Sequence, residues 1–110
     1  MKSEHAAKRV TVYVGETDRF GGHALYQAIV TMLHAEGVAG ATATRGVLGY
    51  GGSGRTHSAH LLDVADDLPV AIVFVESAEV VERVLPKLDE MVRTGLVTID
   101  DVRAIAYSDG

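Results

Sequence analysis

Residues 49–56 read GYGGSGRT and place an arginine and a threonine behind four closely spaced glycines. Glycines permit positive φ and close backbone approach, so their N–H groups can surround an anion, and Arg45 or Arg55 would add positive charge. The segment resembles the phosphate-binding pattern GxxxxGK[ST], but Arg55 replaces the lysine and the following residues favour a strand over a helix. We interpret it as an anion-binding loop and not as a P-loop NTPase; a plain hairpin connection is the alternative.

Two carboxylates, Glu16 and Asp18, follow a predicted strand within the segment GETDR. Paired acids can perform acid–base chemistry or hold a cation. More often such a cluster forms a solvated turn ahead of a helix, and we favour that interpretation. In a binding site, Glu16 would orient Arg45 or a ligand hydroxyl.

The remaining candidates for catalysis or metal binding are histidines. His57 and His60 are three residues apart, which on a strand directs them to opposite faces and disfavours a shared metal within one chain. The sequence has no cysteine and no recognisable Ser/His/Asp grouping. We therefore predict a protein that is not an enzyme and has no cofactor. The alternative is a small metal-binding protein or enzyme that uses Glu16, Asp18 and His57 where copies of the chain meet.

Composition narrows the class of protein. The chain has 110 residues, with 10 Lys and Arg against 15 Asp and Glu, giving a formal charge of −5. This balance argues against nucleic acid as a partner. The absence of cysteine fits a reducing compartment, and no apolar run approaches a membrane span of about 20 residues. We expect a cytoplasmic protein without direct membrane insertion, with residues 1–7 disordered and residues 8–110 forming one domain.

Hydrophobic periodicity predicts the elements that position these residues. Alternation of valines predicts a strand over 9–15, and helical spacing predicts a helix over 23–36 that ends at Gly37. Strands are predicted over 39–48 and 57–65, joined by the glycine-rich loop. A buried strand is predicted over 68–77, and Ser77 is predicted to cap a second helix that ends near Gly95. Pro86 predicts a kink or early break in that helix, and 102–107 is predicted to be a short final strand.

This order predicts an α+β fold, a ferredoxin-like βαββαβ sandwich with an antiparallel sheet and two helices on one face. Val70, Ile72 and Phe74 point to one side of their strand, whereas Ala71, Val73 and Val75 point to the other. Two helices can cover only one face, so the second apolar face needs a partner. We expect a closed homo-oligomer with the sheets turned inward; a monomer whose long loop folds over the sheet is the alternative.

The sequence also resembles the PII-like proteins of domain-of-unknown-function family 190, from Val10 to Tyr107. The stretches that carry the resemblance are YVGETDR, GHALYQAIV, GVAGATATRGVLGYG, HSAHLLDVADDLPV and VERVLPKLDEMVRTGLVTIDDVRAIAY. This family is similar to the trimeric PII signalling proteins, which have a ferredoxin-like fold and sense nucleotides and small metabolites between subunits. The resemblance thus implies a homotrimer that binds a small anionic metabolite, for which an adenine nucleotide is a candidate.

The same resemblance implies roles for particular residues. Gly49, Tyr50 and Gly51 are similar to the base of the PII T-loop, which packs near bound nucleotide. Arg103 falls where PII proteins carry phosphate-binding basic residues, and Thr94 with Gly95 falls near a loop that closes over phosphates. The mobile loop would report the ligand to a partner protein, by analogy a membrane transporter. The predicted ligand-binding set is Arg45, Gly49, Tyr50, Gly51, Gly52, Ser53, Gly54, Arg55, Thr94, Gly95 and Arg103, with polar support from Glu16, Asp18 and His57.

Overall fold

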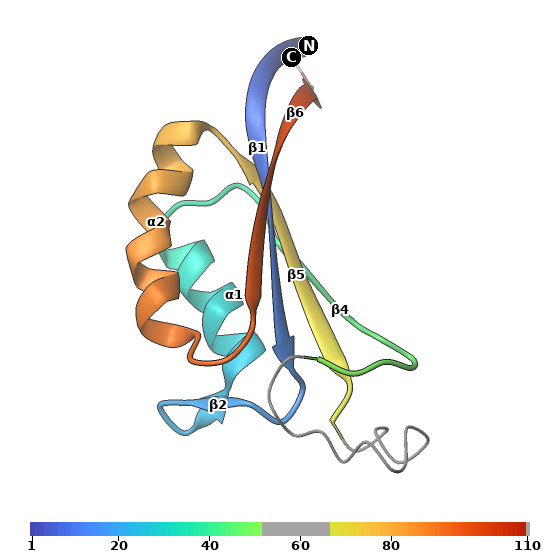
Figure 1. The fold of residues 1–110 in the computed structure, drawn as a ribbon. Coiled ribbons are helices and arrows are strands. Elements are labelled where there is room, and N and C mark those ends of the chain that lie inside the picture. The colour runs from blue at the N-terminus through green and yellow to red at the C-terminus, as the bar shows by residue number, and fades with distance from the viewer. Residues whose placement is uncertain (52–66, 110) are drawn as a thin grey trace.

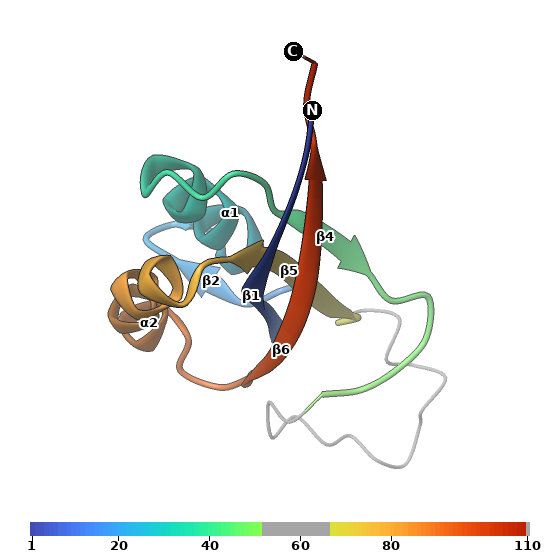
Figure 2. The ribbon, with the colours of Figure 1, turned by 90° about the horizontal axis from the view of Figure 1, so that it is seen from above.

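A computed structural model describes residues 1–51 and 67–109, and the fold is given for these residues. One antiparallel sheet, ordered β4-β5-β1-β6, is covered on one face by two helices (Figures 1 and 2). The predicted ferredoxin-like α+β sandwich is confirmed. The sheet consists of β1 (Lys2–Gly15), β4 (Thr42–Arg45), β5 (Pro69–Glu76) and β6 (Leu96–Tyr107); the helices are α1 (Leu25–Ala35) and α2 (Ala78–Met91), and a small hairpin joins β2 (Arg19–Phe20) to β3 (His23–Ala24).

The core lies between the helices and one face of the sheet. In β1 the predicted alternation buries Val10, Val12 and Val14, which pair in register with Phe74, Ile72 and Val70 of β5. Each helix adds an apolar stripe at three- and four-residue spacing, because that spacing places side chains on one helix face. The stripes are Leu25, Ile29 and Leu33 from α1 and Val81, Val84, Leu88 and Met91 from α2.

The ends of both helices follow local sequence signals. Gly37, with φ of +84°, follows α1, and the bonds from Gly37 N to His34 O (3.1 Å) and from Val38 N to Leu33 O (3.0 Å) form a Schellman motif. Ser77 caps α2 as predicted, because its side chain accepts a hydrogen bond from Val80 N at 3.2 Å. Of the two outcomes predicted at Pro86, a kink or an early break, the early break is wrong, since α2 continues past Pro86 to Met91. The helix ends four residues before Gly95.

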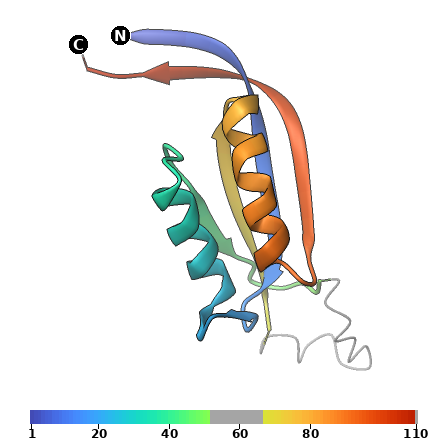
Figure 3. The same ribbon diagram turned by 90° about the vertical axis from the view of Figure 1, so that its left-hand side faces the viewer.

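The N-terminal expectation is also wrong. Residues 1–7 were expected to be disordered, but β1 begins at Lys2 and pairs with β6 from Lys2↔Tyr107 onward. We call the paired segments 2–7 and 102–107 the arm; it extends beyond the ends of the helices (Figure 3). Apolar alternation could not reveal it, because backbone pairing holds its two strands together. One exposed ion pair, Glu4–Arg103, lies within the arm, and two more, Lys8–Asp101 and Arg9–Asp100, lie directly next to it.

Other predicted boundaries shift. The final strand, β6, begins at Leu96 and not at residue 102, and the strand predicted over 39–48 is confined to Thr42–Arg45. Residues 23 and 24, predicted to be helical, belong to β3. Gly21 and Gly22 have φ of 58° and 82°, which suits the tight turn that joins β2 to β3. The strand predicted over 57–65 lies outside the described residues.

The outer face of the sheet, away from the helices, carries no covering element within the described residues (Figure 2). The register aligns Tyr13 with Ala71 and Leu96, and Thr11 with Val73 and Thr98 on this face. Tyr13 is 43% exposed and Leu96 is 58% exposed. The sequence argument that one face would stay uncovered in a single copy agrees with this arrangement.

Candidate functional site

Three strands begin or end close together at the end of the sheet that lies opposite the arm. β1 ends there at Gly15, β4 ends at Arg45, and β5 begins at Pro69. Backbone hydrogen bonds join these ends, from Gly46 N to Pro69 O and from Glu16 N to Leu68 O, each at 2.8 Å. The antiparallel order β4-β5-β1 thus places residues that are far apart in sequence beside one another.

Arg45 and Glu16 form an ion pair that joins the end of β4 to the residue that follows β1. Arg45 Nη1 donates to Glu16 Oε2 at 2.7 Å, the contact that the sequence suggested for Glu16. The Arg45 side chain is 62% exposed and that of Glu16 is 26% exposed. The hydrogen bond to Glu16 and then its negative charge raise the pKa of Arg45, so the guanidinium stays charged.

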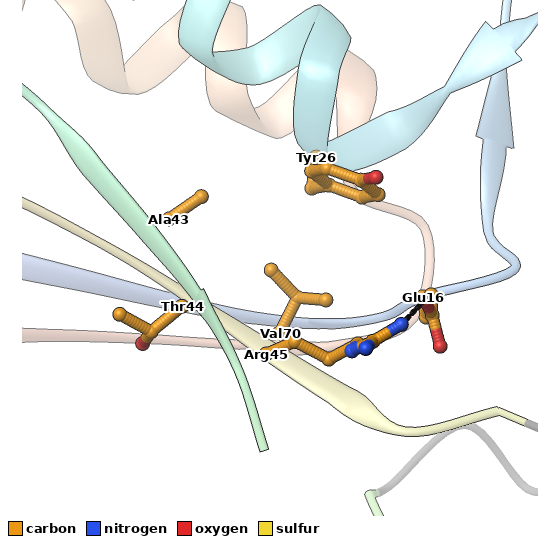
Figure 4. A pocket seen from close by; sticks show the side chains of 6 residues that line it. All are labelled: Glu16, Tyr26, Ala43, Thr44, Arg45 and Val70. Carbon is orange, nitrogen blue, oxygen red and sulfur yellow. Dashed lines mark hydrogen bonds and ion pairs between the residues drawn. The ribbon is translucent and has the colours of Figure 1, made fainter. Parts of the chain in front are cut away.

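The pair borders a small pocket between α1 and the sheet (Figure 4). Tyr26 of α1 lies over the pocket, and the side chains of Ala43 and Val70 point into it from the sheet. Its volume is about 160 Å³, below the roughly 300 to 1,000 Å³ of typical ligand clefts. This pocket alone is too small for a nucleotide, but it has room for a small anion.

The acidic segment after β1 forms a turn. Asp18 Oδ2 accepts a hydrogen bond from Gly15 N at 2.8 Å, and Leu25 N donates to Asp18 O at 2.7 Å, which fixes the start of α1. Thr17 N donates to Asp67 Oδ1 at 3.1 Å. These contacts favour the turn interpretation of the acidic cluster over paired acid–base catalysis.

The described part of the glycine segment follows β4 at the same end of the sheet. A Cβ atom on Gly49, whose φ is +154°, would lie 3.2 Å from Pro69 Cγ. Tyr50 is 73% exposed, and Gly51 is also exposed. The other predicted members of the set, Gly52, Ser53, Gly54, Arg55 and the supporting His57, lie outside the described residues.

Thr94 and Gly95 lie between α2 and β6, at the same end of the sheet as Arg45. Gly95 immediately precedes Leu96, which pairs with Tyr13 of β1. A Cβ atom on Gly95 would lie 2.5 Å from Tyr13 O, so close backbone packing explains this glycine without a ligand. The two residues sit on the β6 edge, whereas Arg45 sits on the β4 edge.

Arg103 does not join this group. It pairs in register with Ala6 in the arm, and its Nε forms an ion pair with Glu4 Oε2 at 2.7 Å. Arg45 lies level with Val14, because both align with Val70 of β5. The two levels are eight residue steps apart along β1, from Ala6 to Val14, or roughly 26 Å at the usual rise of a strand. Within one chain the predicted set therefore divides between opposite ends of the sheet.

Sequence reasoning missed Tyr26, Ala43, Thr44 and Val70 as pocket residues. Tyr26 offered a weak signal, because it stands beside the apolar stripe of α1 and not within it. Ala43 and Val70 gave none, since their position depends on strand pairing.

Among residues 1–51 and 67–109 there is no group of three or more His, Cys, Asp or Glu that could hold a metal ion. No helix among these residues is long and apolar enough to cross a membrane.

The sequence matches the model of a known protein family. The model of DUF190, described as Uncharacterized ACR, COG1993, matches residues 7–104. The chain belongs to the DUF190 family. A UPF0166 protein of Methanocaldococcus jannaschii is 38% identical over 96 residues, covering 86% of this chain and 88% of the relative. A UPF0166 protein of Aquifex aeolicus is 26% identical over 98 residues, covering 89% and 92%.

Solved structures support the fold of this DUF190 chain. Apo CPII of Thiomonas intermedia K12, a nitrogen regulatory PII-like protein, matches with a TM-score of 0.61 and 16% identity, covering 97% of this chain and all 100% of CPII. CPII bound to ADP, AMP and acetate matches with a TM-score of 0.62 and 17% identity, covering 93% and 91%. A protein of Thermus thermophilus described as PII-like matches with a TM-score of 0.57 and 20% identity, covering 94% and 91%. At these identities the likeness establishes a shared PII-like fold.

Proposed function

We propose that this DUF190 protein is a PII-like sensor without enzymatic activity that binds a small anionic metabolite between copies of the chain. An adenine nucleotide is the first candidate, because CPII, whose fold this chain shares, has been solved with ADP and AMP. The observation that carries the proposal is the position of the glycine segment. It leaves the sheet directly after Arg45, a charged arginine that borders a pocket.

The separation of Arg45 from Arg103 supports a site that is shared between copies. Their levels on the sheet differ by roughly 26 Å, so the two arginines of one chain cannot hold the same small ligand. Two copies can bring Arg45 and Arg103 together if the arm of one copy reaches the end of the sheet that carries Arg45 in the next copy. The glycine segment 49–55 would then change its contacts on ligand binding and report the ligand to a partner protein, for which a membrane transporter is a candidate.

The uncovered outer face supports assembly as a homotrimer. Val75 of β5 is 40% exposed there, although it belongs to an apolar strand. Closed symmetric oligomers are the usual way in which a soluble protein covers such a face. Thr11→Asp places a charge at the centre of this face and should shift the protein towards monomers in light scattering. Thr31→Asp, on the exposed side of α1, is the matched control and should leave the mass unchanged; equal behaviour of the two variants would argue against this interface.

Nucleotide binding is tested by thermal shift and calorimetry with ATP, ADP, AMP and cyclic nucleotides. A nucleotide at 100 times its Kd should stabilise the fold by about 2.7 kcal/mol and raise the melting temperature by several degrees. Arg45→Ala and Arg103→Ala should each abolish the shift. Lys87→Ala, which removes a cation that pairs with Glu36 at 3.6 Å, is the control and should keep it. No shift with any nucleotide would refute the nucleotide assignment.

A further inference from the structure

Arg45 has unused binding capacity. A guanidinium carries five N–H donors, and within residues 1–51 and 67–109 the hydrogen bond that this one makes is that from Nη1 to Glu16 Oε2. More than half of the side chain is exposed, so a dissolved anion can reach it. A planar carboxylate matches the fork of an arginine better than it matches a point charge such as lysine.

The ion pair between Arg45 and Glu16 can open, and another carboxylate can then replace Glu16. Exposed ion pairs contribute little to stability, because water and salt compensate both charges when they separate. Glu16 therefore occupies Arg45 in the absence of a ligand without holding it strongly. A second carboxylate can take the same guanidinium while the Glu16 side chain turns towards solvent.

The pocket beside the pair selects for size and charge. A volume of about 160 Å³ accommodates a group of a few heavy atoms, since one water takes about 30 Å³ of liquid. The ring of Tyr26 and the side chains of Ala43 and Val70 give the pocket apolar surfaces (Figure 4). Glu16 remains beside the pocket and repels a dianion more than a monoanion.

From these observations we infer that the pocket beside the Arg45–Glu16 pair binds a small monocarboxylate, which replaces Glu16 on the Arg45 guanidinium. The pocket is lined by Glu16, Tyr26, Ala43, Thr44, Arg45 and Val70. The ligand's carboxylate accepts the hydrogen bonds of Arg45, and its short apolar end contacts Tyr26 and Val70. This site shares Arg45 with the proposed nucleotide site, so the inference deepens the proposed function by naming the class of small anion, but it lies within one copy and acetate binding is measured without nucleotide.

Backbone hydrogen bonds connect the residues of this pocket to the start of β5. The backbone N–H of Glu16 donates to Leu68 O, and Gly46, the residue after Arg45, donates to Pro69 O. Separation of the ion pair therefore acts on two residues that are bonded to the start of β5. Occupancy of the pocket should consequently be visible in the amide signals of Glu16 and Gly46 as well as in the side chain of Arg45.

The experiment is an NMR titration of the ¹⁵N-labelled full chain with sodium acetate and, separately, sodium formate at constant ionic strength. Saturable shifts of the Arg45 Nε–H signal and of the Glu16 and Gly46 amides are expected, with sodium chloride and phosphate producing none of them. Glu16→Gln removes the competing charge and should tighten acetate binding roughly two- to fivefold. Loss of binding in Arg45→Gln completes the expected pattern.

Arg83→Gln is the matched control, because Arg83 also pairs with a glutamate, Glu36, but at the C-terminal end of α1, whereas Tyr26 of the pocket lies in its first turn. It should leave the acetate titration unchanged. Tighter binding in Glu16→Gln cannot result from misfolding, so this variant guards against a trivial loss in Arg45→Gln. The inference is overturned if chloride reproduces the shifts, if Glu16→Gln binds acetate no more tightly, or if Arg83→Gln weakens binding as much as Arg45→Gln. Failure of nucleotides in the thermal-shift test leaves each of these outcomes unaffected.

Discussion

Two Arg–Glu ion pairs lie at opposite ends of the same sheet, and each has an N···O distance of 2.7 Å. Arg45 and Glu16 join β4 to the end of β1 beneath Tyr26 of α1, whereas Arg103 and Glu4 join the two strands of the arm. The Arg103 side chain is 76% exposed, and the arm extends past the helices (Figure 3). A larger but shallower hollow of about 580 Å³ lies beside Arg103 and Glu4 and is lined by residues of the two arm strands and Asp101, whereas the pocket of about 160 Å³ beside Arg45 is also covered by Tyr26 of α1. The comparison teaches that the elements packed around an ion pair, and not its own geometry, make it a candidate binding site.

The largest expected contrast concerns the packing at the two ends. Ile72 is fully buried between the sheet and the helices, whereas Ile105 in the arm is 37% exposed. Ile72→Ala should lower the free energy of unfolding by about 2 to 5 kcal/mol, because it leaves a cavity in the core. Ile105→Ala should cost less than about 1 kcal/mol for a single copy.

Chemical denaturation at a low protein concentration measures both changes for a single copy, and repeating it at a high concentration tests for a second copy. If Ile105→Ala costs as much as Ile72→Ala, the arm is packed against something and is not a free ribbon. A cost that grows with protein concentration would identify a second copy as the element that packs on it.

A smaller effect is expected at the glycine that lets β6 approach β1. Gly95→Ala would bring a Cβ atom to within 2.5 Å of Tyr13 O, a contact that requires the backbone to move. We expect a loss of about 1 to 3 kcal/mol in the free energy of unfolding, measured by thermal or urea denaturation. Gly40→Ala is the control, because no atom lies within 4 Å of the position of its Cβ. Equal losses in the two variants would show that close approach to Tyr13 is not the cause.

The smallest effect is expected at the ion pair of the arm. Glu4→Gln should change the free energy of unfolding by less than about 1 kcal/mol, and this change should shrink as salt is added. It should also leave acetate binding unaltered, in contrast to Glu16→Gln. Urea denaturation at two salt concentrations, together with the acetate titration, measures both properties. Tighter acetate binding in Glu4→Gln would remove the distinction between the two ends of the sheet.

Local signals in the sequence were enough for most of the fold. The valines of 9–15, the apolar run of β5, Gly37 after α1 and Ser77 before α2 act through neighbours three or four residues away, or through strand alternation. The uncovered outer face also followed from the sequence, because β5 is apolar on both sides while two helices can cover one. These features depend on residue type and spacing alone.

Features that depend on distant pairing could not be read in the same way. Residues 1–7 look polar and irregular in sequence, but β6 supplies their backbone hydrogen bonds from about a hundred residues away. The start of β6 at Leu96 was missed for the same reason, since its exposed side chains show no alternation between buried and exposed faces. Pro86 was expected to kink α2 or to end it early, but α2 does not end there, because the buried stripe of Val84, Leu88 and Met91 continues on both sides of it.

For the candidate site, the sequence by itself determined which groups carry charge: Arg45, Glu16 and Arg103, together with the glycines that follow β4. The tertiary structure alone decided which of them meet. Strand order β4-β5-β1 brings Arg45 to Glu16 beneath Tyr26, and strand register places Arg103 at the other end of the sheet. The physical reason is that charge and backbone freedom belong to single residues, whereas a pocket exists only where segments distant in sequence pack together.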